Sequence, residues 1–336
     1  MIVKGMSENN IQGQKEEQNW ENLLRPDNFD EYIGQDSVKR SLGIILEAAN
    51  KREESIDHIL FYGQAGLGKT TLAHIVAKET GGNLKVTSGP AIEKTGDLAA
   101  ILTNLENGDI LFIDEIHRLN RMIEEVLYPA MESRTLNIVL GKGPSARTIS
   151  IDLPPFTLVA ATTRIDLLSG PLRSRFGATF RLDYYSSGNI AEITKRSAKI
   201  LGMEIDEEAL TMLSEVSRFT PRTANRILKR ARDLAQVRGE AIINRKCLEE
   251  LFEILEIDDL GLEYQDRRIL TILRDQFNGG PAGVGAISSS LGEERGVIEG
   301  IYEPYLIKMG LIKRTPSGRM LTDKGIKYIE KIVGND

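Results

Sequence analysis

The chain has 336 residues, which is long for a single domain and suits two or three. It carries 43 Lys and Arg against 49 Asp and Glu, a net charge of −6, which excludes a protein that coats nucleic acid by bulk charge. Any contact with phosphate must therefore come from a local basic patch. The single cysteine, Cys247, and the three histidines exclude an internal disulfide and a Cys/His zinc site, and they favour a reducing, cytoplasmic environment.

The N-terminal segment, residues 1–20, lacks the apolar core of a signal peptide and is rich in Gln, Asn and Glu. We expect it to form a flexible tail. No apolar run in the chain approaches the roughly 18 residues that a membrane-spanning helix needs. The sequence therefore predicts no membrane contact.

Residues 21–183 alternate short β-branched runs with helical patterns. Several of the runs are almost continuously apolar, as in a parallel sheet that is covered by helices on both faces. This pattern predicts a layered α/β domain with right-handed crossovers. The expected strands begin at His58, Leu84, Asp109, Phe156 and Ala178.

The pattern changes after residue 183. Residues 184–257 have apolar side chains at helical spacing and no convincing strand, which predicts a small all-α domain whose basic helix ends at Gly239. Residues 258–336 indicate a helix, a Gly/Pro break, a short helix, a longer helix and two short strands that turn at Pro316-Ser317-Gly318. That order predicts a winged helix-turn-helix.

The segment GQAGLGKT, Gly63 to Thr70, matches the phosphate-binding pattern G-x-x-x-x-G-K-[ST] between an expected strand and an expected helix. Gly66 and Gly68 allow backbone N–H groups to close around an anion, and the helix N-terminus adds partial positive charge. Lys69 is expected to reach the terminal phosphates of a nucleotide, and the Thr70 hydroxyl to ligate Mg²⁺. The sequence therefore predicts ATP or ADP with Mg²⁺ as its ligands.

The run ILFIDE ends in Asp114 and Glu115 and follows the phosphate-binding segment by some 45 residues. Acidic residues at the carboxyl end of a buried strand lie beside the phosphate loop in such sheets. We expect Asp114 to hold Mg²⁺ and Glu115 to orient and deprotonate the attacking water. Without the phosphate loop, the same pair would be interpreted as helix-capping acids, and the neighbouring His117 is interpreted as structural.

Further segments resemble the RuvB family, bacterial AAA-type motors that drive branch migration of Holliday junctions. The resemblance extends from about Leu23 to Arg319. The segments that carry it are LLRPDNFDEYIGQ, GLGKTTLA, GDLAAILTNLE, LFIDEIHRL, EEVLYPAME, GKGPSAR, DLPPFTLVAATTR, PLRSRFG, TPRTANRIL and EPYLIKMGLIKRTPSGR.

The resemblance implies an AAA-type P-loop ATPase domain, a helical lid domain and a C-terminal winged helix. It also implies roles for residues that the pattern alone leaves unassigned. Thr163 would be the polar sensor of the attacking water, Arg175 an arginine finger that acts on a neighbouring subunit with Arg173 assisting, and Arg222 a second sensor from the lid. The implied nucleotide-binding residues are Leu24, Arg25, Gly66, Gly68, Lys69, Thr70, Thr71, Glu132, Ser133, Arg134, Arg175, Tyr185 and Arg222.

Two segments depart from the pattern usual in this family. Gln64 and Ala65 replace a pair of prolines in the phosphate loop, at positions where the backbone does the binding, so we expect ATP binding to survive. Ser133 and Arg134 replace a more acidic and aromatic pattern. Without the family, Thr163 would be an ordinary strand end, and Arg173 and Arg175 would be solvated surface arginines.

Apolar residues alternate with polar ones on both sides of GKGPSA, which predicts a β-hairpin over residues 136–153 with one apolar face. The hairpin could pack on its own domain. The resemblance to the RuvB family favours a docking surface for the junction-binding protein RuvA, because exposed apolar patches mark protein contacts.

The predicted wing concentrates positive charge: residues 305–324 hold five basic residues against Asp323 alone. Such a hairpin can be merely a solvated surface, but the resemblance places Arg314 and Arg319 on the DNA backbone, where contacts position without reading sequence. The expected recognition helix carries Glu293, Glu294, Glu299 and Glu303, which would repel phosphate. This argues against sequence-specific docking.

The resemblance as a whole implies an ATP-hydrolysing homohexamer that translocates duplex DNA at Holliday junctions in recombination and repair, with RuvA and a possible junction resolvase as partners. Two other classes fit the domain order. One is an ATP-switched DNA-binding initiator, which the hairpin and the acidic recognition helix disfavour. The other is a clamp-loader-like assembly factor, which the C-terminal wing disfavours.

Overall fold

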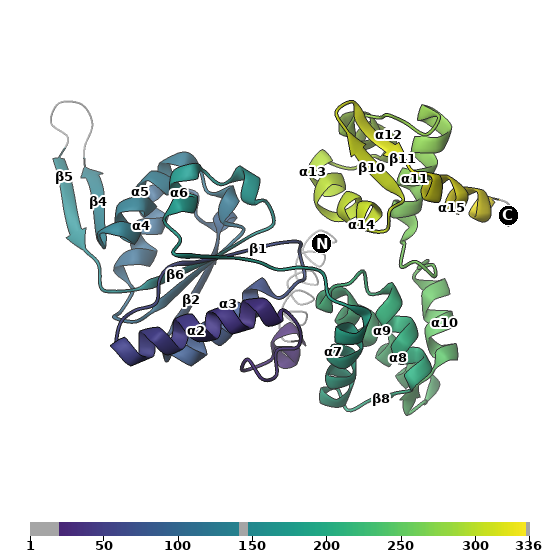
Figure 1. Cartoon of the computed structure of the whole chain (residues 1–336), viewed down its shortest axis with the longest axis horizontal. Helices are drawn as coiled ribbons and strands as arrows, with labels where there is room; N and C mark the ends of the chain where they lie inside the picture. Colours follow the sequence, from purple (N-terminus) through teal and green to yellow (C-terminus); the bar gives the residue numbers. More distant parts are fainter. Residues whose placement is uncertain (1–19, 141–146, 334–336) are drawn as a thin grey trace, which may run out of the picture. The chain divides into compact units, whose positions relative to one another are not determined.

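The computed structural model describes residues 20–140 and 147–333 of the chain. Two compact units divide after Tyr185, and each is described by itself (Figure 1). The tail expected over residues 1–20 lies almost wholly outside the described residues. Among the residues that are described, no helix is long and apolar enough to cross a membrane.

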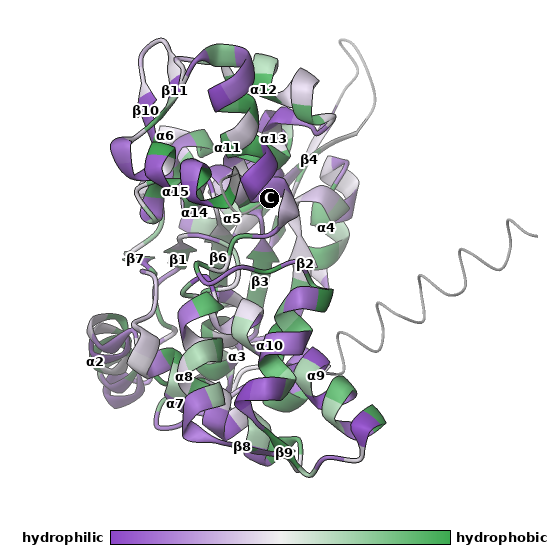
Figure 2. Ribbon diagram, turned by 90° about the vertical axis from the view of Figure 1, so that its right-hand side faces the viewer, coloured by the Kyte–Doolittle hydropathy of each residue, from purple (hydrophilic) through white to green (hydrophobic). Residues whose placement is uncertain are grey.

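A five-stranded parallel sheet forms the centre of the first unit, with the strand order β2-β3-β6-β1-β7. The inner strands are almost wholly buried, and β3 stands out as hydrophobic in Figure 2. The edge strands β2 and β7 contain only partly buried and exposed residues. All five predicted strands are found in this sheet. Their bounds are β1 (Ile59–Tyr62), β2 (Leu84–Ser88), β3 (Ile110–Asp114), β6 (Thr157–Thr162) and β7 (Ala178–Arg181).

Helices cover both faces of the sheet, as the apolar strands require. Leu60, Leu111 and Leu158 pack with α4, α5 and α6 in one buried cluster, and Figure 1 shows α2 and α3 on the opposite face. The bounds are α2 (Asp36–Arg52), α3 (Lys69–Thr80), α4 (Thr95–Thr103), α5 (Arg121–Glu132) and α6 (Gly170–Ser174), with 3₁₀ turns η1 (Gly89–Ala91), η2 (Ile116–Arg118) and η4 (Ile165–Leu167).

Strands β4 (Thr135–Leu140) and β5 (Arg147–Asp152) form the predicted hairpin, which extends beyond the body of the first unit in Figure 1. Leu136 pairs with Ile151, and Leu136 is fully buried in the core of the unit. Ile149, farther along the hairpin, is 46% exposed. The base of the hairpin therefore packs on its own domain, while its outer part leaves an apolar side chain in solvent.

The second unit begins with the predicted helical segment. Its helices α8 and α9 start at side-chain caps, since Asp206 accepts from the Ala209 N–H and Thr220 from the Thr223 N–H, and α9 ends at Gly239 as predicted. The expectation of no strand here was wrong, because β8 and β9 form a two-residue parallel pair. The bounds are α7 (Ser187–Ile200), β8 (Glu204–Ile205), α8 (Glu207–Val216), α9 (Pro221–Arg238), β9 (Ile242–Ile243) and α10 (Arg245–Ile254).

The remainder is the predicted winged helix, with three differences. The single longer helix expected before the wing is interrupted by a π-helical segment, the wing turn contains only Pro316 and Ser317 because Thr315 pairs with Gly318, and a C-terminal helix follows that was not predicted. The bounds are α11 (Tyr264–Phe277), α12 (Val284–Leu291), α13 (Arg295–Val297), π-helical η5 (Ile298–Tyr302), α14 (Glu303–Lys308), β10 (Ile312–Thr315), β11 (Gly318–Leu321) and α15 (Asp323–Val333).

A buried contact joins the helical segment to the winged helix. The Arg218 Nη2 donates to Asp266 Oδ1 at 3.0 Å, and the Arg218 guanidinium lies 4.4 Å from the ring centroid of Tyr305. Asp266 is fully buried, and this burial raises its pKa to about 6 against the attraction of Arg218. Arg218 itself adopts a left-handed backbone, with φ 56°. The two parts of the second unit are thus joined by a specific polar contact.

Candidate nucleotide-binding and catalytic site

The phosphate-binding loop lies between β1 and α3, where the sequence places it. Gly63, Gly66 and Gly68 have φ of 145°, 79° and 95°, a region that glycine enters without strain. Lys69 is 6% exposed, and its Nζ donates to the carbonyl oxygens of Gly63 and Gln64 at 2.8 Å each. Because Gln64 takes part through its backbone, its replacement of proline leaves the cradle of this loop intact.

Two tyrosines hold the far side of the loop. The hydroxyls of Tyr32 and Tyr185 lie 3.3 and 3.2 Å from the Leu67 carbonyl and 3.0 Å from each other. A Cβ on Gly68 would meet the Tyr32 hydroxyl at 2.6 Å, so this glycine is required by a neighbour as well as by its φ. Tyr185 was expected near the nucleotide. Tyr32 was not identified from the sequence, because the contact joins residues 35 positions apart.

Asp114 is the last residue of β3 and Glu115 follows it, while Thr163 follows β6. These strands and β1 are consecutive neighbours in the sheet, so their carboxyl ends bring Lys69, Glu115 and Thr163 to one edge. The Thr163 hydroxyl donates to Glu115 Oε2 at 3.1 Å, and the Glu115 N–H donates to Asp114 Oδ1 at 2.9 Å. The geometry places the predicted sensor against the predicted base.

His117 also contacts this carboxylate, although the sequence suggested only a structural role for it. Its Nδ1 lies 3.0 Å from Glu115 Oε2 and 2.9 Å from the Thr162 hydroxyl. Burial raises the pKa of Glu115, but hydrogen bonds from His117 and Thr163, with the charges of His117 and Lys69, outweigh it and leave the pKa below its ordinary value. Glu115 is therefore ionised at neutral pH and can accept a proton.

The oxygen ligands available for a cation are those that Mg²⁺ prefers. Thr70 and Thr71 lie in the first turn of α3, and Asp114 ends β3 with a carboxylate. Within the described residues there is no cluster of three or more His, Cys, Asp or Glu that could form an all-protein cage. One hydroxyl and one carboxylate fit Mg²⁺, which usually keeps several waters and takes its other ligands from substrate phosphates.

The N-terminal candidates lie close to the same helix. Leu24 is 6% exposed, and burial lowers the pKa of Arg25. Burial, together with the positive charge of Arg25, lowers the pKa of His74 on α3 to about 4. The Arg25 guanidinium therefore lies near the helix that opens at the phosphate loop.

The candidates of α5 and α6 form a second group on the first unit. Arg175, directly after α6, donates to Glu132 Oε2 at 3.1 Å, while Arg173 is exposed. Ser133 ends α5 and its hydroxyl lies 2.7 Å from that of Thr135, and Arg134 has a left-handed φ of 56°. The contact between Arg175 and Glu132 was not predicted from the sequence.

The remaining candidates belong to the second unit. Arg222 is exposed in the first turn of α9, so its approach to a nucleotide stays a prediction. Glu303 was expected to repel phosphate, and this was wrong: it is 1% exposed and accepts from Arg314 Nε at 2.7 Å and Arg319 Nη2 at 2.8 Å. Arg319 also donates to Glu299 at 2.8 Å. The wing therefore presents less net charge than its sequence indicates.

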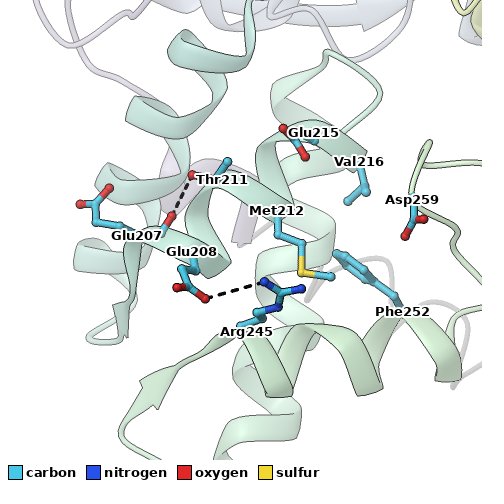
Figure 3. Close-up of a pocket in the computed structure, with 9 residues that line it drawn as sticks. All are labelled: Glu207, Glu208, Thr211, Met212, Glu215, Val216, Arg245, Phe252 and Asp259. Atoms are coloured by element: carbon cyan, nitrogen blue, oxygen red, sulfur yellow. Dashed lines mark hydrogen bonds and ion pairs between the residues drawn. The ribbon is translucent and has the colours of Figure 1, made fainter.

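A separate hollow of about 580 Å³ lies between α8 and α10, with Glu208 and Arg245 facing each other 3.9 Å apart (Figure 3). It contains none of the predicted site residues. Its lining is Glu207, Glu208, Thr211, Met212, Glu215, Val216, Arg245, Phe252 and Asp259.

The parallel sheet, the phosphate loop and the acid–threonine pair define a P-loop ATPase of the AAA type, followed by a lid and a winged helix. Family models describe the same three parts: "Holliday junction DNA helicase RuvB P-loop domain" matches residues 24–182, "RuvB AAA lid domain" residues 185–258, and "RuvB C-terminal winged helix domain" residues 259–330. The chain belongs to the RuvB family.

Solved structures agree with this assignment. The Thermotoga maritima RuvB Holliday junction branch migration motor is 48% identical, with a TM-score of 0.85 over 92% of this chain and 98% of that chain. A lysine-to-arginine variant of the same protein matches at 48% identity and a TM-score of 0.85, over 91% of this chain and 98% of that chain.

Proposed function

We propose that this protein is an ATP-driven motor that translocates duplex DNA and so drives branch migration of Holliday junctions. The observation that carries the proposal is the meeting of Lys69, Glu115 and Thr163 at the carboxyl ends of three neighbouring strands. Membership of the RuvB family and the match of all three of its domain models support this reading over a DNA-binding initiator or a clamp loader.

The proposed reaction is hydrolysis of ATP to ADP and phosphate. The backbone N–H groups of the loop and Lys69 bind the phosphates, and Thr163 orients a water beside Glu115. The water oxygen attacks the γ-phosphorus, its proton passes to the Glu115 carboxylate, and the bond to the ADP oxygen breaks. Thr70 and Asp114 would hold Mg²⁺, which when bound would supply positive charge beside the phosphate oxygens.

Arginines from outside the loop complete the proposed site. Arg175, with Arg173 assisting, acts on the nucleotide of a neighbouring subunit, which requires a ring, and we propose a homohexamer. An arginine finger supplied in this way contributes roughly 10³ to 10⁵ in rate. Arg222 senses the γ-phosphate from the lid, and Leu24, Arg25 and Tyr185 contact the rest of the nucleotide, with Glu132, Ser133 and Arg134 at the subunit boundary.

The same proposal assigns the other surfaces. The outer part of the hairpin over residues 136–153, where Ile149 is exposed, docks the RuvA-type junction-binding protein. Arg314 contacts the DNA backbone without reading sequence. Arg319, which was expected to make the same contact, is 9% exposed and paired with Glu299 and Glu303, so it stabilises the wing instead. The Arg218–Asp266 contact transmits movement of the lid to the winged helix. A junction resolvase is a further partner of the assembled complex.

The deciding experiment measures ATP-dependent dissociation of a four-way junction by the full chain, with and without the RuvA-type partner. We expect Lys69→Ala to lower turnover and junction dissociation by about a hundredfold or more, because it removes the cation on the transferred phosphate. Lys78→Ala, at the exposed end of the same helix, is the matched control and should behave as wild type. Normal turnover in Lys69→Ala would refute the ATPase assignment, and ATP-dependent DNA binding without junction dissociation would favour the initiator.

A further inference from the structure

Three groups of the first unit hold the Arg175 guanidinium. It lies 4.5 Å from the ring centroid of Tyr128, donates to the Pro171 carbonyl at 2.8 Å and to Glu132 at 3.1 Å. The side chain of Arg175 is 27% exposed, although it carries a full charge. The guanidinium is therefore held in a fixed direction at the surface instead of extending into solvent.

The hydroxyl of Tyr128 is itself held by two side chains. Its hydroxyl donates to Glu124 Oε2 at 2.9 Å, and Glu124 is 5% exposed within α5. The same hydroxyl lies 2.8 Å from Ser169 Oγ, and Ser169 caps the first turn of α6 by accepting from the Leu172 N–H. Tyr128 thus contacts the cap at the start of α6 with its hydroxyl and the Arg175 guanidinium, directly after the end of α6, with its ring.

The contacts of Arg175 differ in what they do to its charge. An ion pair with Glu132 offsets the charge, and Glu132 is exposed and free to exchange with water. The ring of Tyr128 attracts the guanidinium through its π face and leaves the positive charge in place. A group that must stabilise negative charge on another molecule is better held by such a face than by a carboxylate.

We propose that Tyr128 is a positioning residue for Arg175, holding the guanidinium in the direction in which it meets the nucleotide of the neighbouring subunit. This inference rests on the proposed function, since it requires that Arg175 acts in trans. Tyr128 acts through Arg175 and does not touch the substrate. Replacing a side chain whose only role is packing would impair the subunit that carries the change. Replacing a positioning residue of this kind lowers turnover at the active site of the neighbouring subunit.

The test uses the full chain with Tyr128→Leu, which removes the ring, and Tyr128→Phe, which keeps the ring and removes both hydroxyl contacts. We expect Tyr128→Leu to bind ATP as wild type and to lose turnover by about tenfold to a hundredfold, because small misplacement of a catalytic group costs on the order of a hundredfold. Tyr128→Phe should lose less. Tyr264→Leu is the matched control, since it removes another tyrosine ring, which lies 5.9 Å from Arg268, and it should keep wild-type turnover.

The deciding measurement mixes Tyr128→Leu with Lys69→Ala. Lys69→Ala subunits have an intact Tyr128 and Arg175, so in mixed rings they supply a well-placed finger to the active sites of the Tyr128→Leu subunits, and turnover should recover. Wild-type turnover of Tyr128→Leu alone, or a loss without recovery on mixing, would overturn the proposal. If Tyr128→Leu does not fold, Tyr128→Met, which also removes the ring, takes its place under the same two criteria.

Mixing Arg175→Ala with Lys69→Ala distinguishes the role of Tyr128 from the action of Arg175 on its neighbour. Recovery in this pair shows that mixed rings form and that Arg175 acts in trans. If turnover recovers in the mixture with Arg175→Ala but not in the mixture with Tyr128→Leu, the proposed role of Tyr128 is refuted and the action of Arg175 on its neighbour stands. If neither recovers, the action of Arg175 on its neighbour fails, and the role of Tyr128 fails with it.

Discussion

Lys69 and Arg319 are both buried cations at positions expected to meet phosphate, but their partners are of opposite kinds. The Lys69 Nζ donates to two neutral backbone carbonyls of the phosphate loop. Arg319 donates to two carboxylates, Glu299 and Glu303. The two neutral carbonyls position the lysine without offsetting its charge, whereas the two carboxylates that accept from the arginine offset the charge of the arginine.

This difference distinguishes a cation that serves ligand binding from a cation that stabilises the fold. The phosphate loop holds the Lys69 ammonium through neutral carbonyls in a site with low exposure, where a positive charge attracts an anion strongly. The wing uses the same type of charge first to fasten β11 to α14, through the Arg319–Glu303 pair, while Arg314, whose side chain is 57% exposed, pairs with the same glutamate from the outside. A positive residue in a basic segment can therefore serve the fold as much as the ligand.

The largest expected effect comes from removing the buried arginine. We expect Arg319→Met to lower the unfolding free energy of the winged helix by about 3–5 kcal/mol, because the buried Glu303 carboxylate loses a charged partner. Hydrogen exchange of the β10 and β11 amides in the full chain measures this local stability. Arg314→Met, at a side chain that is 57% exposed, is the control and should cost much less. Equal protection in the Arg319 and Arg314 variants would contradict the fastening role.

A smaller effect is expected from the charge of Glu303. Burial raises the pKa of Glu303, but hydrogen bonds from Arg314 and Arg319 outweigh it, so the pKa in the folded protein lies below that in the unfolded chain. The ionised form therefore stabilises the fold above the unfolded pKa, and this contribution is lost as the pH falls through the lowered folded pKa.

Glu303→Gln checks the sign of this dependence. At pH 7 we expect the variant to be about 1.5–3 kcal/mol less stable than wild type, because hydrogen bonds to a charged acceptor become bonds to a neutral one. Urea unfolding followed by circular dichroism between pH 7 and pH 3 should show the difference shrinking toward low pH. Glu330→Gln, at an exposed acid of α15, provides the baseline. If the difference in unfolding free energy between wild type and Glu303→Gln grew as the pH falls, a lowered pKa of Glu303 would be contradicted.

The sequence predicted those features that are local. The five strands and the phosphate loop could be identified because apolar runs and the G-x-x-x-x-G-K-[ST] spacing occur within a few residues of each other. Glu115 and Thr163 were named separately, and their 3.1 Å contact follows from the neighbouring positions of β3 and β6, which the sequence does not state.

Features that depend on distant pairs escaped prediction. The Tyr32 contact with Leu67 and the stack of Tyr128 on Arg175 join segments that are separated by 35 and 47 positions. Counting charges along the wing treats every charged side chain as exposed, so the burial of Glu303 against Arg319 could not be anticipated. The two-residue strands β8 and β9 are too short to show any period.

The smallest expected effect concerns DNA affinity, and it tests whether charge cancellation limits the wing. A phosphate contact releases counterions, so its loss lowers the slope of log K against log salt by about 0.9. We expect Arg314→Gln to lower the slope by this amount on duplexes of any sequence. Glu303→Gln should instead keep or steepen the slope, because it removes one of the two carboxylates that offset the charge of Arg319. Glu330→Gln controls for the general change in net charge. A lower slope in Glu303→Gln, or an unchanged slope in Arg314→Gln, would show that the phosphate contacts of this domain lie elsewhere.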